Sequence, residues 1–148
     1  MRLASWQEGL AYRTEPSPES IADLRERTLR WTDRDDAGGG RTCKERLLPV
    51  AAGTVAGSPT ALDHRGVAQA IRNGWAEVGV CVQLAAEEAG LSFLPVQEGH
   101  YDICYSPQFE GDPRLDALLE VVQSQDFRRT IGELPGYDTG MTGEVRIA

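Results

Sequence analysis

The sequence contains no apolar run close to the roughly 20 residues needed to cross a bilayer. Its first eight residues, MRLASWQE, become polar almost at once and lack the apolar core of a secretory signal peptide. Both absences favour a cytoplasmic protein without a membrane partner.

Cysteine is scarce, and the three cysteines are Cys43, Cys81 and Cys104. An odd number at wide spacing does not indicate a disulfide framework, and no CxxC pair is present to bind a metal ion. We therefore expect reduced thiols, no metal site and no cofactor.

Sequence motifs for nucleotide chemistry are also missing, because neither GxGxxG nor a Gly-Lys-Ser/Thr loop occurs. The two histidines, His64 and His100, stand in no local pattern that pairs a base with a nucleophile. These absences favour a protein that is not an enzyme.

Acidic residues outnumber basic ones, which gives the chain a formal net charge of -8. Such a field repels nucleic acid and anionic lipid, so we expect no direct nucleic-acid partner. The length of 148 residues suits one domain with a core of its own.

Strand-like and helix-like segments alternate along the chain, which predicts an α/β fold with a mostly parallel sheet flanked by helices. The expected strands cover residues 8–14, 28–32, 75–82, 91–96 and 101–105. Residues 51–60 are rich in glycine, alanine, serine and proline, and we expect a loop there.

Helix boundaries are marked by capping residues and glycines. Helices are expected after Ser17-Pro18, around residues 47–50, from Asp63 to Gly74, over 84–89 before Gly90, after Asp112-Pro113 and after Ser124.

A glycine-rich turn, Gly38-Gly39-Gly40-Arg41, follows an expected strand and precedes an expected helix. Backbone N–H groups of such a turn and the Arg41 charge favour binding of an anion. The alternative is a plain flexible turn, which the acidic pair Asp35 and Asp36 supports.

Two further segments are candidates for ligand contact. Cys81 and Gln83 lie where the strand over 75–82 ends and the next helix begins, and strand ends line ligand crevices in α/β sheets. Tyr137 and Thr139 belong to a polar turn near the end of the chain. A helix-start role for Gln83 and a helix-ending role for the turn are the alternatives.

Nearly the whole chain, most clearly from Asp63 onward, resembles the second lobe of the type 2 periplasmic-binding-protein-like domain found in cytoplasmic molybdate-responsive regulators and in molybdopterin-biosynthesis fusions. The resemblance rests on His64-x-x-Val67-Ala68-x-Ala70-Ile71-x-x-Gly74-x-Ala76-Glu77-Val78-Gly79-Val80, on Gly90-Leu91-x-Phe93-x-Pro95 and on Leu134-Pro135-Gly136-Tyr137-Asp138-Thr139. It implies one lobe, over residues 1–148, of a clamshell that holds molybdate or tungstate between two lobes.

In such a lobe the matching ligand-binding positions are the Gly38–Arg41 turn and the strand end from Cys81 to Gln83. The turn departs from the family pattern, because glycines stand where hydroxyl residues are usual.

Three hypotheses follow. The chain is an oxyanion-sensing lobe that works with a partner lobe or as a homo-oligomer. Alternatively, it is a degenerate lobe that serves as a protein-interaction or oligomerisation module without a ligand. The third, an enzyme linked to molybdenum-cofactor synthesis, lacks a recognisable catalytic pair.

Overall fold

The computed structural model describes residues 1–15, 17–34, 43, 46 and 59–145. The chain divides into two compact units, unit 1 with residues 1–7 and 98–148 and unit 2 with residues 8–97. Strands β1 (Arg2–Tyr12) and β5 (Ser92–Asp102) each contribute residues to both units. The expectation of a single lobe over residues 1–148 stays a prediction.

Strand β4 (Val78–Val82) lies at the centre of unit 2, and all five of its residues are buried. Val78 and Val80 join a core cluster that also contains Leu24 and Trp31. A side chain at Gly79 would instead collide with side chains of the helix α3 (His64–Arg72) and with Thr32. Because successive residues of a strand face opposite sides, β4 is covered on both faces.

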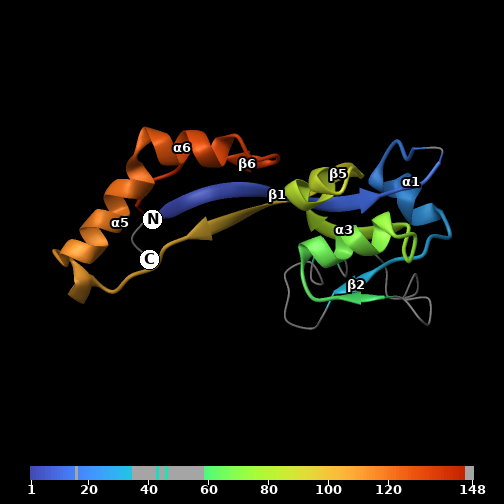
Figure 1. The fold of residues 1–148 in the computed structure, drawn as a ribbon, viewed down its shortest axis with the longest axis horizontal. Coiled ribbons are helices and arrows are strands. Elements are labelled where there is room, and N and C mark those ends of the chain that lie inside the picture. The colour runs from blue at the N-terminus through green and yellow to red at the C-terminus, as the bar shows by residue number, and fades with distance from the viewer. Residues whose placement is uncertain (16, 35–42, 44–45, 47–58, 146–148) are drawn as a thin grey trace. The chain divides into compact units, whose positions relative to one another are not determined.

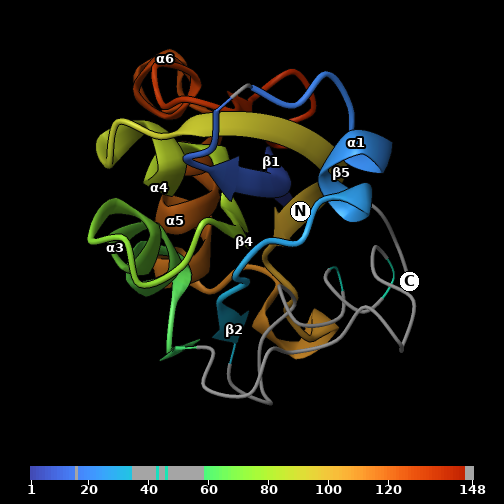
Figure 2. The same ribbon diagram turned by 90° about the vertical axis from the view of Figure 1, so that its right-hand side faces the viewer.

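Helices on both faces produce this burial. Helix α1 (Ile21–Glu26) supplies Leu24 to the core cluster, and α3 packs on β4 and on helix α4 (Gln83–Glu88). Figure 2 shows α1 and α3 on opposite sides of the strands. The mixed α/β character predicted from the sequence is therefore confirmed.

The prediction of a mostly parallel sheet was wrong for the main sheet. β1 pairs antiparallel with β4 through Glu8 to Tyr12, and antiparallel with β6 (Tyr137–Asp138) through Ser5 and Trp6. Parallel pairing joins β2 (Asp33–Arg34) to β3 (Thr60–Ala61). Trp31 and Val78 form one further parallel bridge.

Two strands were expected, over 91–96 and 101–105, and the structure has one strand, β5, in this part of the chain. β5 is an edge strand that lies next to β1. Pro95 is tolerated in β5 because an edge strand does not need every N–H for pairing. Gly99 is covered by the Trp6 indole, where a larger residue would collide with the ring. An aromatic ring that shields a strand glycine allows the strand to continue through Gly99.

The segment over 28–32 was also predicted as a strand, and only Trp31 forms a β-bridge there. The first helix begins later than expected, after Ser20, whose hydroxyl accepts from the Asp23 amide. Ser17 precedes Pro18, and a residue before proline avoids helical backbone. The helix predicted around 47–50 falls outside the described residues, as does most of the loop predicted over 51–60. At the end of that loop Thr60 belongs to β3, so the loop is one residue shorter than predicted there.

The remaining helix boundaries were confirmed. Asp63 caps α3 by accepting from the Gly66 amide, and Gly74 follows with a positive φ of 75°. Asp112 caps α5 (Pro113–Gln123), and Ser124 caps α6 (Gln125–Gly132). The two helices follow each other directly, because Ser124 ends one and starts the other (Figure 1).

Unit 1 is held by contacts around the first strand. Met1 exchanges two backbone hydrogen bonds with Ile103, each of 2.8 Å, as in an antiparallel pair. Arg2 donates to Asp102 over 2.6 Å, and the Trp6 and Tyr101 rings stack with centroids 5.4 Å apart. A short 3₁₀ turn, η1 (Pro107–Phe109), precedes α5. Among the described residues, no helix is long and apolar enough to cross a membrane.

Gly79 provides a test of the packing on β4. Gly79→Ala places a methyl group against Thr32 and Val67, and overpacking of this kind costs about 1–3 kcal/mol of unfolding free energy. Gly132→Ala is the control, since its added carbon meets only the Thr139 hydroxyl at 3.4 Å. Chemical denaturation measures both. An unchanged midpoint for Gly79→Ala would contradict the packing described here.

Candidate functional site

Three strand ends meet at one edge of unit 2. β2 and β3 are parallel, with Arg34 opposite Ala61. The parallel bridge from Trp31 to Val78 places the chain from Trp31 to Arg34 alongside β4, running in the same direction. Arg34, the residues after Ala61 and the residues after Val82 therefore emerge at the same edge. In α/β proteins, ligands bind outside the carboxyl ends of such strands.

Arg34 is a basic residue of this edge, and its side chain is half-buried. Its Nη1 donates to the His64 Nδ1 over 3.1 Å. Its Nε is buried and has no hydrogen-bond partner among the described residues. A buried donor without a partner is costly, so this N–H is available to an acceptor from a ligand or a water molecule.

His64 is the first residue of α3 and follows the capping residue Asp63. Burial, and next to it the positive charge of Arg34, lower its pKa from 6.5 to about 4, while Asp63 acts in the opposite direction. The imidazole is therefore neutral at pH 7. Because Nδ1 accepts from Arg34, the ring proton of His64 lies on Nε2.

Cys81 lies in β4 and is fully buried. Burial raises the pKa of its thiol to about 12; Arg34 lowers it and Glu8 raises it to a smaller extent. Burial also raises the pKa of the Cys43 thiol, to about 11. Both thiols are neutral at pH 7, and nucleophilic cysteines need the thiolate.

Glu8 stands opposite Val82 on β1, and only 2% of it is exposed. Gln97 donates to Glu8 Oε2 over 2.6 Å, while Glu8 Oε1 is buried without a partner among the described residues. By strand alternation Glu8 faces the side of Val78 and Val80, away from α3. It thus belongs to the opposite face of the sheet from Arg34 and His64.

The site residues expected from the sequence are divided between the two units. Cys81 and Gln83 belong to unit 2, and Tyr137 and Thr139 to unit 1. The Gln83 amide donates to Glu87 over 2.7 Å, which directs this side chain along its own helix. Gly38, Gly39, Gly40 and Arg41 lie outside the described residues. Their roles in ligand binding stay predictions.

Arg34 was missed from the sequence, because it belongs to none of the segments predicted to contact a ligand. The available signal was a basic residue at the end of a strand, one position after Asp33. In the part of the chain that the structure describes, no three His, Cys, Asp or Glu side chains come close enough to hold a metal ion.

Acid is expected to destabilise unit 2 through His64. Its pKa is lower in the folded chain, about 4 against 6.5, so the unfolded chain binds the proton more readily between these values. Stability therefore falls as the pH falls from about 6.5 to 4, by about 1–2 kcal/mol after solvent screening of this half-buried group.

Denaturant unfolding at pH 7 and pH 4 measures this loss. The comparison is His64→Gln, which keeps an acceptor for Arg34 and does not titrate. Equal losses in the two chains would show that His64 does not carry the effect.

Comparison with known proteins places the chain in a family. A family model described as the PBP superfamily domain matches residues 1–123. YvgK, an uncharacterized protein of Bacillus subtilis (strain 168), is 29% identical over 141 residues, which cover 90% of this chain and 45% of YvgK. An uncharacterized protein in the ferredoxin 2Fe-2S gene 5' region of Clostridium pasteurianum is 24% identical over 102 residues, 68% of this chain and 90% of that protein.

The chain therefore spans less than half the length of YvgK. The family model, in contrast, matches most of the 148 residues, including the whole of unit 2. The chain belongs to the periplasmic-binding-protein (PBP) superfamily.

Proposed function

We propose that unit 2 binds an oxyanion at the strand ends beside Arg34 and His64. Molybdate and tungstate are the oxyanions we favour, with the chain acting as a sensing lobe in a regulator or in molybdenum-cofactor metabolism. Membership of a superfamily of binding proteins supports a binding role. The observation that carries the proposal is the half-buried guanidinium whose Nε lacks a partner among the described residues.

A guanidinium suits an oxyanion because it offers several donors in one plane and keeps its charge at any physiological pH. Hydrogen bonds between ionised groups are also shorter and stronger than neutral ones. The neutral His64 accepts from Arg34 through Nδ1 and has no proton equilibrium near pH 7. The net charge of -8 repels anions at long range, so affinity must come from these local donors.

The same groups favour binding over catalysis. The Cys81 thiol beside Arg34 is held neutral by burial, and the nearby imidazole has a pKa of about 4. Neither group supplies a nucleophile or a base near pH 7. We therefore propose that the chain is not an enzyme.

Calorimetric titration with molybdate, tungstate and sulfate tests the oxyanion proposal. Arg34→Met is expected to weaken binding by about 10- to 100-fold, since a hydrogen bond to a charged group contributes about 1.5–3 kcal/mol. Arg30→Met is the control, because it removes the same charge from a side chain that is 57% exposed. The proposal fails if the wild-type chain gives no heat at millimolar ligand, or if both variants bind alike.

A second candidate function is protein interaction, and an apolar stripe on α5 favours it. Within that helix only Val122 is buried, whereas Leu118 is 45% and Val121 is 57% exposed. An amphipathic helix normally buries such a stripe against another element. We propose that a partner lobe or a second copy of the chain covers this stripe.

Light scattering tests the interaction. The wild-type chain is expected to form a dimer or a larger assembly, and the double substitution L118E with V121E is expected to yield monomers by placing charges in the stripe. Thr130→Glu, at an exposed position of α6, is the control. A wild-type monomer that binds oxyanion would exclude this second candidate.

A further inference from the structure

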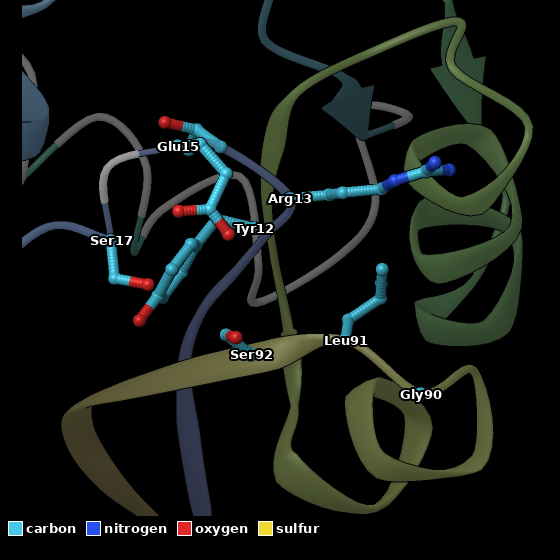
Figure 3. A pocket seen from close by; sticks show the side chains of 8 residues that line it. Tyr12, Arg13, Glu15, Ser17, Gly90, Leu91 and Ser92 are labelled. Atoms are coloured by element: carbon cyan, nitrogen blue, oxygen red, sulfur yellow. The ribbon is translucent and has the colours of Figure 1, made fainter.

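A pocket of about 280 Å³ lies in unit 2 where β1 ends and β5 begins. Tyr12, Thr14, Glu15, Ser17 and Ser92 line it with polar groups, and Arg13, Gly90 and Leu91 complete the lining (Figure 3). Tyr12 pairs with Val78 at the start of β4, whereas Cys81 and Gln83 lie at its end. Four residues of strand separate the two places by about 13 Å, so this pocket is distinct from the oxyanion site.

Tyr12 gives the pocket a fixed polar group. The residue is 7% exposed, and it belongs to the core cluster with Leu10, Val78 and Val80. The hydroxyl ends at the pocket, and no hydrogen bond joins it to any other described residue (Figure 3). The core around its ring keeps the phenol from turning away, so the hydroxyl stays at the pocket and is open to a partner there.

The two charged residues of the lining, Arg13 and Glu15, point in different directions (Figure 3). Arg13 points away from the Tyr12 hydroxyl, and its Nη1 donates to the Arg72 carbonyl over 3.1 Å (Figure 3). The Glu15 carboxylate lies on the side of Tyr12 and Ser17, and forms no ion pair with a described residue (Figure 3). The pocket therefore presents the Glu15 carboxylate together with the hydroxyls of Tyr12, Ser17 and Ser92. The hydroxyl of Thr14, which also lines the pocket, already accepts from Arg27 over 3.1 Å.

We infer that this pocket binds a small organic cation that carries hydroxyl groups, of the kind found in amino sugars and amino alcohols. An ammonium group satisfies the Glu15 carboxylate through charge-assisted hydrogen bonds. Ligand hydroxyls both donate and accept, which matches the hydroxyls of Tyr12, Ser17 and Ser92. The negative net charge of the chain raises the local concentration of such a cation.

Titration followed by NMR amide shifts tests the inference with three probes: glucosamine, glucose and choline. Glucosamine has both the ammonium and the hydroxyls, glucose lacks the charge, and choline lacks N–H donors. We expect glucosamine to bind at least about tenfold more tightly than either, with shifts centred on residues 90–92, because the loss of a charge-assisted hydrogen bond costs about 1.5–3 kcal/mol.

Two variants locate the contacts. Tyr12→Phe removes the hydroxyl and keeps the ring in the core, and Glu15→Gln removes the charge at similar size; each is expected to weaken glucosamine binding about five- to tenfold. Glu19→Gln removes the same charge from an exposed residue outside the pocket and is expected to bind like the wild type. Amide spectra of each variant report whether its fold is kept.

The inference is overturned by any of three results. Wild-type chain that shows no shifts at millimolar glucosamine has no such site. Equal affinity for glucose excludes recognition of the cation. Equal weakening by Glu15→Gln and Glu19→Gln means that the net charge, and not the pocket, attracts the ligand.

Discussion

The burial of β4 on both faces is the constraint on which the rest of unit 2 depends. A strand of five buried residues needs apolar partners on each side, and here the α1 cluster and α3 provide them. Position 79 requires glycine, because α3 and Thr32 approach the strand too closely for a side chain there. β4 ends at Val82, where α4 begins, and this boundary sets where the strand-end residues emerge.

The elements near β4 were predictable because their signals are local. Asp63 precedes an apolar helical period and Gly74 ends it, so α3 could be placed from sequence alone. Strand direction was not predictable, because alternating strands and helices indicate parallel pairing. β1 joins the sheet across a large sequence separation and in the opposite direction. Likewise the Trp6 ring over Gly99 is a contact between residues 93 positions apart.

The candidate site was predictable in its location and not in its chemistry. The strand end at Cys81 and Gln83 follows from the buried run before it, whereas Arg34 reaches that edge only through the pairing of short strands. Charges also lie on both faces of the sheet, with Arg34 beside α3 and Glu8 on the other side. A sequence does not distinguish these faces until the register is known, because a shift of one residue exchanges them.

The division of β1 between the units has a consequence for sequence change. Ser5 and Trp6 pair with β6, and Glu8 to Tyr12 pair with β4, along one uninterrupted strand. An inserted residue near Gln7 would shift the pairing of β1 with either β4 or β6 by one position. It would also turn every later side chain of β1 to the opposite face of the sheet. Leu10 would leave the core and Glu8 would change sides. Length variation among relatives should therefore be confined to the connections and excluded from β1.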